Sequence, residues 1–484
     1  MERRRPFSLR SLAAMVVAIA ALGAVSPVPG ISDPAAAQAS TKPNIVVIMT
    51  DDQTLESLRV MRWTQELIGQ QGTTFTNAFV SYPECCPSRA TFLTGQYAHN
   101  HGVVSSGLPT GGVTKLQADN TLPVWLDRAG YWTSFTGKYL NGYGKDAPAN
   151  IPAGWDNWWG MVDPSTYRIF GYTINKDGVL ETQGSSAADY PTDVLGSHVV
   201  DVIRSRAGKP EPFFIWFNPV APHTVTRIGT GPGYPLPAPR HRFSLPDQQV
   251  PRHAGFNEAD VSDKPSFMRS LPQLTPLNES NRDATYRMEL QMLLAVDEWV
   301  KAIHQALSDI RALSNTIIVF TSDNGFMHGE HRIPQGKTVP YEEALRVPLL
   351  VRGPGFPAGV TRTQLVGNID LAPTLAAAAG VAPGLTVDGI ALQPLARSAI
   401  AGPDRSLLIT SGPFRGRRTF SGIRGTRYKY VERSNGEKEL YDLLIDPYET
   451  ENVAGKPGWV SIERSLATRL AGLRNCGGID CVRK

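Results

Sequence analysis

Three segments of the chain are almost continuously apolar and rich in β-branched and aromatic residues. They are residues 44–49 (NIVVIM), 213–217 (FFIWF) and 316–320 (TIIVF). Short runs of this kind are typical of strands buried on both faces of a sheet. The polar residues that follow them are Asp51-Asp52, His223 and Asp323-Asn324. Because ligands bind beyond the carboxyl ends of strands in open α/β sheets, we expect these side chains to meet in one crevice.

Helical patterns lie between these strands. Residues 284–307 carry an apolar stripe at helical spacing, formed by Tyr286, Leu290, Leu293, Val296, Val300, Ile303 and Leu307. We interpret this stripe as one that packs into the core. Residues 224–276 are instead rich in proline, glycine and isolated charges. This composition predicts an extended loop region beside the crevice.

The pattern changes after Pro383-Gly384. Short strands separated by turns are predicted at residues 406–410, 418–421, 428–431 and 439–443, followed by a helix at 459–473. The chain is therefore predicted to have an α/β fold. Residues 40–383 would form a large domain with a mostly parallel, mixed sheet covered by helices. Residues 384–484 would form a small α+β subdomain with an antiparallel sheet and a helix.

Residues 1–39 have the pattern of a cleavable export signal. Arg3-Arg4-Arg5 precede an apolar run from Leu12 to Val25, and Ala37-Gln38-Ala39 would precede the cleavage point. The run is too short for a membrane span, so we expect no stable span in the mature chain. The paired arginines also suggest the twin-arginine route, and an uncleaved anchor is the alternative. In each case the body of the protein would be exported, either secreted or associated with the cell envelope.

Composition limits the partners of this protein. The chain has 484 residues, of which 41% are apolar and 19% charged, as in ordinary folded proteins. Its net charge is only +4 and its basic residues are dispersed, so we expect no binding to nucleic acid. Two of the four cysteines, Cys476 and Cys481, are close together near the end of the chain. In an exported protein this spacing favours a small disulfide loop over two free thiols.

Residues 85–95 (CCPSRATFLTG) combine a thiol, a fixed cation and a predicted helix start. Pro87 suits the first helical position and Gly95 suits the end, so Cys85 is expected just ahead of a short helix. Unpaired N–H groups and the positive end of the helix dipole would then face whatever Cys85 holds. Arg89 follows one turn later and should project from the same face, which predicts an anion-binding site. An inert buried pair of cysteines or a redox dithiol is the alternative.

Asp51, Asp52, Asp323 and Asn324 supply three carboxylates and an amide oxygen. An all-oxygen set suits a hard divalent cation such as Ca²⁺ or Mg²⁺, whereas zinc favours histidine or thiolate. Taken alone, an Asp pair after a strand is commonly a helix cap and Asp-Asn-Gly is commonly a turn. Their occurrence together with the Cys85 motif favours a metal site.

The string at residues 85–95 matches the pattern C-x-P-S-R-x-x-x-x-x-G and resembles the signature of the type I sulfatases, which belong to the alkaline-phosphatase-like superfamily. In that family the formylglycine-generating enzyme oxidises the first cysteine of the motif to formylglycine after translation. The resemblance implies that Cys85, and not Cys86, is the modified residue. It also implies a divalent cation, Ca²⁺ with Mg²⁺ as the alternative. The implied ligands are Asp51, Asp52, the modified Cys85, Asp323 and Asn324.

The resemblance also implies roles for other polar residues. Lys138, in Gly-Lys-Tyr-Leu-Asn, would contact the sulfate ester. His223 would contact the substrate oxygen or the leaving group, and Lys337 would be a second active-site lysine. For each of them a surface or structural role is the alternative. Many family members have a histidine two residues after the first lysine, where this chain has Leu140, and Asn141 is a candidate substitute.

The resemblance extends from about Lys42 to the C-terminal sheet, including Tyr441-Asp442-Leu443 and Asp446-Pro447. Within the sulfatases the motifs are most similar to the N-acetylglucosamine-6-sulfatase and heparan-sulfatase branch. They are Cys-Cys-Pro-Ser-Arg at 85–89, His-Asn-His at 99–101 and Gly-Lys-Tyr-Leu-Asn at 137–141. We interpret His99 and His101 as structural or supporting residues.

These motifs together imply a sulfuric ester hydrolase that cleaves a sulfate monoester of a sulfated carbohydrate or an aryl sulfate. The hydrated aldehyde at residue 85 would attack sulfur, with Arg89 and the cation favouring its ionised form. His223 or Lys337 would protonate the leaving oxygen, and Lys138 would neutralise charge on the sulfuryl oxygens. Two alternatives stay open: a phosphodiesterase or phosphonate monoester hydrolase with the same site, and a non-catalytic sulfated-glycan binding protein in which Cys85 is unmodified.

Overall fold

The computed structural model describes residues 42–225, 233–398, 400, 403–412 and 420–483. The predicted export signal at 1–39 lies outside these residues, as do the first two positions of the strand predicted at 418–421. No helix within the described part of the chain has the length and apolar character needed to cross a bilayer.

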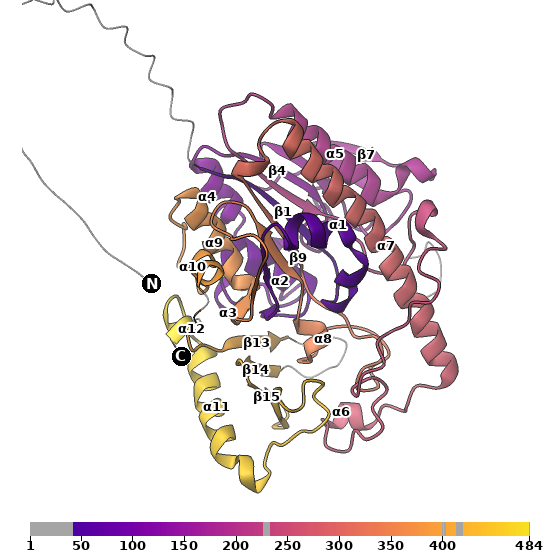
Figure 1. Ribbon diagram of the computed structural model, residues 1–484, viewed down its shortest axis with the longest axis vertical. Coiled ribbons are helices and arrows are strands. Elements are labelled where there is room, and N and C mark those ends of the chain that lie inside the picture. Colours follow the sequence, from indigo (N-terminus) through magenta and orange to yellow (C-terminus); the bar gives the residue numbers. More distant parts are fainter. Residues whose placement is uncertain (1–41, 226–232, 399, 401–402, 413–419, 484) are drawn as a thin grey trace, which may run out of the picture. The chain divides into compact units, whose positions relative to one another are not determined.

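Ten strands of the described residues form one large, twisted sheet (Figure 1). From one edge to the other they are β11 (Val360–Arg362), β2 (Thr73–Phe75), β10 (Leu349–Arg352), β9 (Thr316–Ser322), β1 (Asn44–Thr50), β8 (Phe213–Asn218), β4 (Trp132–Gly137), β5 (Asn157–Met161), β6 (Thr173–Lys176) and β7 (Val179–Thr182). The central strands β9, β1, β8, β4 and β5 are parallel, whereas β10, β6 and β7 pair antiparallel with their neighbours. The predicted mostly parallel, mixed sheet is therefore confirmed.

Side chains of β1 alternate between two apolar cores. Ile45 and Val47 belong to the core on one face, which is covered by α2 (Cys85–Thr94), α4 (Leu122–Arg128) and α9 (Leu371–Ala379). Val46 and Ile48 belong to the core on the other face, under α5 (Pro191–Ser205) and α7 (Pro276–Asp309). Figure 1 shows the two groups of helices on opposite sides of the sheet. Burial on both faces explains why β1 is apolar at nearly every position.

Helix α7 contains the stripe predicted for residues 284–307, and all seven of its apolar side chains are buried. The helix begins eight residues earlier than predicted, at Pro276, because Thr275 caps it by accepting a hydrogen bond from the backbone N–H of Asn278. The predicted loop region at 224–276 is irregular where it is described, apart from a turn at Pro239–His241 and the short helix α6 (Ser266–Arg269).

A second, four-stranded antiparallel sheet follows, made of β13 (Leu407–Ser411), β14 (Phe420–Arg424), β15 (Tyr428–Arg433) and β16 (Lys438–Asp442). Helix α11 (Val460–Leu473) packs against it, as predicted. Residues of this sheet share one apolar cluster with Phe79, Leu345 and Val347 of the larger part. The division of the chain at residue 383 stays a prediction.

The remaining α-helices and strands of the described residues are short. They are α1 (Arg62–Thr64), β3 (Ala78–Phe79), α3 (Ala98–His101), α8 (Glu342–Leu345), β12 (Val366–Gly367), α10 (Gln393–Arg397) and α12 (Asp480–Arg483). Strands β3 and β12 form a separate parallel pair.

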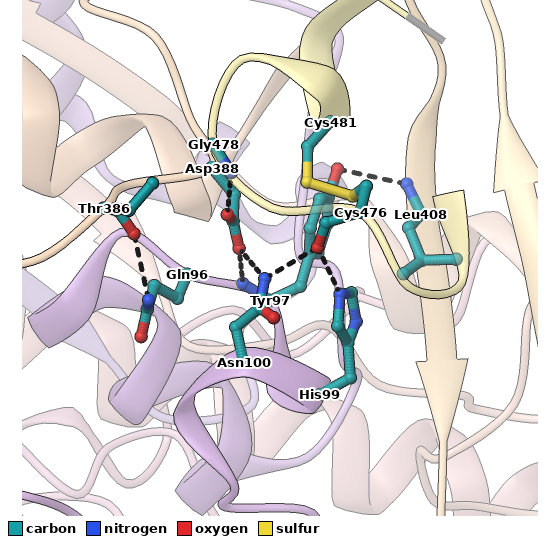
Figure 2. The surroundings of a disulfide bond; sticks show 10 residues. All are labelled: Gln96, Tyr97, His99, Asn100, Thr386, Asp388, Leu408, Cys476, Gly478 and Cys481. Carbon is teal, nitrogen blue, oxygen red and sulfur yellow. Dashed lines mark hydrogen bonds between the residues drawn. A yellow bond between two sulfur atoms is a disulfide. The ribbon is translucent and has the colours of Figure 1, made fainter. Parts of the chain in front are cut away.

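The predicted bond between Cys476 and Cys481 is present and closes a loop that lies against α3 (Figure 2). The carbonyl oxygen of Cys476 accepts hydrogen bonds from His99 Nε2 and Asn100 Nδ2, both at 2.9 Å. Asp388 accepts from Asn100 Nδ2 and from the backbone N–H of Gly478, both at 2.8 Å. His99 therefore anchors the C-terminal loop, in agreement with its structural interpretation.

Candidate active site

The ends of β1, β8 and β9 bring the polar residues together. The backbone N–H of Asp51 donates to Ala221 O at 3.2 Å, and that of Asp323 donates to Thr50 O at 3.1 Å. The bond of Asp323 extends the pairing of β1 and β9 by one residue, and the bond of Asp51 ties the end of β1 to the segment after β8, so the side chains that follow share one edge of the sheet. Asp52 then turns through a left-handed backbone conformation (φ +67°), which Asp tolerates better than most residues.

Cys85 is the first residue of α2, directly beneath this edge. The helix was predicted to begin at Pro87 but includes Cys85 and Cys86 as well, because the first turn of a helix has no use for the N–H that proline lacks. Its end was predicted correctly: Gly95 adopts a left-handed conformation and stops the helix. Cys85 Sγ lies 3.3 Å from Asp51 Oδ1 and 2.7 Å from Lys337 Nζ.

Arg89 projects from the same helix into the same region and is completely buried. Its Nε donates to Asp323 Oδ2 at 2.8 Å, and Nη1 donates to Lys138 O at 2.7 Å and to Asn218 Oδ1 at 3.0 Å. These three bonds fix the plane of the guanidinium group. Nη2 is buried without a hydrogen-bond partner in the described structure, so the arginine keeps the two N–H donors of this nitrogen for an anion.

Two lysines pair with the two aspartates that follow β1. Lys138 Nζ contacts Asp51 Oδ2 and Lys337 Nζ contacts Asp52 Oδ1. Burial alone would lower the pKa of each lysine, but Asp51 beside Lys138 and Asp52 beside Lys337 outweigh burial and raise both pKa values well above the usual range. Both lysines are therefore fixed positive charges, suited to hold the oxygens of an anionic substrate.

The pKa values of the two aspartates are shifted downward. Burial would raise the pKa of Asp51, but Lys138 and His223 outweigh it and lower the pKa to about 2. The pKa of Asp52 is also lowered, because Lys337 and His223 outweigh its burial. For Cys85 the balance is different: burial and the nearby Asp51 raise the pKa of its thiol well above the usual range. The unmodified thiol is therefore protonated, and a protonated thiol is a poor nucleophile.

His223 reaches the same cluster from the loop after β8. Its Nδ1 donates to Thr224 O at 2.6 Å, which directs Nε2 toward Asp52 Oδ2 at 3.6 Å. The imidazole also lies against the ring of Tyr167, with 4.4 Å between ring centroids. A histidine held in this orientation can exchange a proton at Nε2.

The oxygen atoms at this edge fit a hard divalent cation. Asn324 Nδ2 donates to Asp52 Oδ1 at 2.6 Å, whereas Asn324 Oδ1 is buried without a hydrogen-bond partner in the described structure. A buried acceptor without a donor is costly unless a ligand satisfies it. One potential ligand atom each of Asp51, Asp52, Cys85 and His223 lies within 4.8 Å of the others. His223, which the family resemblance assigned to the substrate oxygen or the leaving group, is thus also close enough to be a ligand.

Two residues of the site escaped the sequence interpretation. Asn218 holds Arg89, and its position at the end of β8 was a signal that could have been used. Tyr167 lies in an irregular segment and gave no signal, yet its ring lies 4.9 Å from Lys138 Nζ. Tyr167 Oη also accepts a hydrogen bond from Asn141 Nδ2 at 3.0 Å. Asn141 therefore reaches the edge of the site, but through the tyrosine.

His101 lies apart from this cluster. Its Nε2 contacts Thr91 Oγ1 at 3.0 Å, and burial lowers its pKa to about 3. A neutral, partly buried imidazole that supports α2 fits the structural interpretation.

Residues 43–381 match the family described as Sulfatase, and residues 329–476 match the C-terminal region of N-sulphoglucosamine sulphohydrolase. This chain belongs to the sulfatase family. It is accordingly an enzyme that hydrolyses sulfate esters, and the family implies a metal cofactor for which the cluster around Asp51 is the candidate site. The resemblance to the sulfatases that the sequence motifs indicated is thereby confirmed.

Named relatives agree with this assignment. The chain is 32% identical to an arylsulfatase of Volvox carteri, covering 92% of this chain and 76% of the relative. It is 32% identical to human N-acetylglucosamine-6-sulfatase, covering 92% and 87% of the two chains. A putative extracellular sulfatase of Caenorhabditis elegans is 35% identical over 73% of this chain and 49% of the relative.

Solved structures share the fold. One is a protein in complex with its substrate D-glucosamine-2-N,6-O-disulfate, with a TM-score of 0.75 and 25% identity, covering 89% of this sulfatase and 97% of that chain. A phosphonate monoester hydrolase of Agrobacterium radiobacter aligns with a TM-score of 0.65 and 22% identity, over 90% and 95% of the two chains. The latter similarity is one of fold alone.

Proposed function

We propose that this sulfatase removes a sulfate monoester from a sulfated amino sugar, with a formylglycine made from Cys85 as its nucleophile and Ca²⁺ as its cation. The observation that carries the proposal is the setting of Cys85. Its sulfur lies between Asp51 and Lys337 at the start of α2, where burial and Asp51 keep the thiol protonated. This position is suited to a nucleophile, but a protonated thiol is a poor nucleophile.

The Cys85 sulfur stands where a hydroxyl of the hydrated aldehyde would be, and that hydroxyl supplies the nucleophilic oxygen. Lys337, at 2.7 Å from the sulfur, would stabilise negative charge on this oxygen. Arg89 and Lys138 would bind the sulfuryl oxygens, because both are buried cations. Asp323 holds Arg89 in place, and Asp51 holds Lys138. His223 would donate a proton from Nε2 to the leaving oxygen, since its Nδ1 is committed to Thr224 O.

Asp51, Asp52, Asp323 and Asn324 would hold the cation, together with the oxygen at residue 85. A bound Ca²⁺ would supply positive charge beside the sulfuryl group and favour ionisation of the attacking hydroxyl. Support comes from the all-oxygen donor set and from the unpartnered Oδ1 of Asn324. Mg²⁺ remains the alternative occupant.

The substrate class rests on similarity. The solved complex with D-glucosamine-2-N,6-O-disulfate and human N-acetylglucosamine-6-sulfatase both concern sulfated glucosamine, whereas the Volvox relative is an arylsulfatase. A sulfated amino sugar is therefore the substrate that we would test first, with an aryl sulfate as the general probe.

The proposal includes export and maturation. The predicted signal at residues 1–39 and the disulfide between Cys476 and Cys481 support secretion or attachment to the cell envelope, through the twin-arginine or the general route. A formylglycine-generating enzyme would act on Cys85 before the fold buries it. Residues 40–383 would form the catalytic domain. Residues 384–484 would form the small C-terminal subdomain.

The test has two parts on one preparation from the native host. Peptide mass spectrometry reads residue 85, where an aldehyde is lighter than the thiol because oxygen replaces sulfur and two hydrogens. The same protein is then assayed with an aryl sulfate and the matching aryl phosphate. We expect the aldehyde and faster hydrolysis of the sulfate. An unmodified thiol with multiple turnovers would contradict the proposed nucleophile, and faster hydrolysis of the phosphate would favour a phosphorus ester as substrate.

A further inference from the structure

A second group of potential metal ligands lies outside the active site. It consists of His331 in the loop after β9, Glu343 in α8 and Glu449 in the segment after β16. One ligand atom of each lies within 4.8 Å of the others. The side chains of His331 and Glu449 are 0% and 1% exposed, and that of Glu343 is 17% exposed. Three separate parts of the chain thus converge on one largely buried position.

His331 is oriented as metal-binding histidines are. Its Nδ1 donates to Glu258 Oε2 at 2.6 Å, and Lys264 Nζ holds the other oxygen of Glu258 at 3.0 Å. A proton fixed on Nδ1 leaves a lone pair on Nε2. That Nε2 is buried and has no hydrogen-bond partner in the described structure. A carboxylate on one ring nitrogen and an unused lone pair on the other is the arrangement that supports metal ligation.

The two carboxylates have few cations around them, and the basic group nearest to Glu343 is the imidazole of His253, with 3.6 Å between Nε2 and Oε1. Glu343 Oε2 is buried without a hydrogen-bond partner among the described residues. Glu330 and Glu449 place further carboxylates beside Glu343. Glu449 contacts Lys429, but this lysine is shared with Glu342. An additional cation, or a proton, is needed to balance the group.

We propose that His331, Glu343 and Glu449 bind a divalent transition-metal ion of the zinc class. One imidazole nitrogen and two carboxylate oxygens suit Zn²⁺ better than Ca²⁺, which takes oxygen ligands. The site is therefore chemically distinct from the all-oxygen set at Asp51. Its role would be structural, because it ties the loop that carries Lys337 to α8 and to the C-terminal subdomain.

Zinc content is the direct test. The full chain carrying Cys85→Ser, which removes the buried thiol as a competing zinc ligand, is equilibrated with zinc in excess calcium and freed of unbound metal. Elemental analysis should find one zinc per chain. Adding Glu343→Gln, a substitution of nearly equal shape at a partly exposed position, should weaken zinc binding at least about 10-fold, as should His331→Gln.

His328→Gln is the matched control. His328 is a buried histidine three residues from His331, but its Nε2 pairs with Glu289 instead, at 2.5 Å. This variant should retain the zinc. Zinc should also raise the melting temperature of the parent and of His328→Gln but not that of Glu343→Gln. The proposal is overturned if the parent binds no zinc in excess calcium, or if Glu343→Gln binds it as tightly as His328→Gln does. In either case a shared proton balances the group.

Discussion

Cys85 and Cys86 are neighbours in the chain but lie in different surroundings. Cys86 belongs to the apolar core under α2, where burial raises the pKa of its thiol to about 12, and Cys85 faces the charged cluster. Two buried thiols with raised pKa values are a poor redox pair, which disfavours the dithiol alternative.

This difference predicts opposite results for two matched variants. Cys85→Ala should lower multiple-turnover hydrolysis of an aryl sulfate by more than about 1000-fold, because it removes the proposed nucleophile. Cys86→Ala should keep activity within about 3-fold and lose about 1 kcal/mol of stability, through a small core cavity. Cys85→Ser lacks the second hydroxyl and should stall after one turnover. Equal activity of the two alanine variants would contradict the assignment.

Asp51 should link stability to pH. Its pKa in the folded state, about 2, lies below the usual value of 3.8, so its contribution is present above pH 3.8 and is lost as pH falls toward about 2. The difference corresponds to about 2 kcal/mol in the metal-free protein. Lys138→Met removes the main cation opposing burial, so it should destabilise more at neutral pH than at about pH 3. Urea titrations at both pH values measure this, and a pH-independent loss would argue against the pair.

Tyr167 should act through its ring. The ring lies 4.9 Å from Lys138 Nζ and 4.4 Å from the His223 ring, whereas its hydroxyl only accepts from Asn141. Tyr167→Leu should therefore lower kcat/KM about 10-fold, in the range of a buried cation–π contact. Tyr167→Phe is the control and should stay within about 3-fold. A larger loss in the phenylalanine variant would mean that the hydroxyl and Asn141 matter more than the ring.

At the scale of elements, the disulfide loop clamps α3 to the C-terminal end of the chain. Its five-residue separation closes a small ring, for which loss of the bond should cost about 2 kcal/mol. In a chain of this length we expect a fall in melting temperature of about 2 °C for the Cys476→Ser/Cys481→Ser double variant, with kcat unchanged. Asn100→Ala should have a similar effect, because Asn100 bonds both Cys476 O and Asp388. A large fall in kcat would show that the loop also supports the active site.

The elements with a strong local signal were predictable. The central strands and the stripe of α7 are apolar over many positions, so their type could be read without tertiary information. Helix boundaries were less certain, because they depend on single caps. Thr275 starts α7 ahead of its apolar stripe, and the helix at Cys85 begins two residues before Pro87, the predicted start.

At the scale of the whole molecule, the sequence predicted those residues of the site that directly follow the central strands. Asp51, His223 and Asp323 were placed together because parallel strands end at one edge. The contacts of Lys337 with Asp52 and Cys85 depend on a long loop whose path no local pattern reveals. The same holds for Tyr167, which arrives from a segment without periodicity. The role of Lys337 came from family resemblance, whereas Tyr167 was found only in the structure.

One apolar cluster crosses the boundary predicted at residue 383. Phe79 and Leu345 share an apolar cluster with Leu407 and residues of the small sheet. Across the same boundary, the nearly buried Arg405 pairs with Asp370, with 3.0 Å between Nη1 and Oδ1. A fragment ending at residue 383 would therefore expose apolar surface and leave a buried carboxylate without its cation.

We accordingly expect residues 40–383, expressed alone, to be insoluble or to lack cooperative unfolding, while the full chain unfolds in one transition. Tryptophan fluorescence and loss of activity should then report the same urea midpoint. The variant Arg405→Met is the control within the intact chain: breaking one buried pair should cost about 3–5 kcal/mol without separating the two parts. Two distinct transitions in the full chain, or a soluble fragment with native-like cooperativity, would show that the small sheet folds as a separate domain after all.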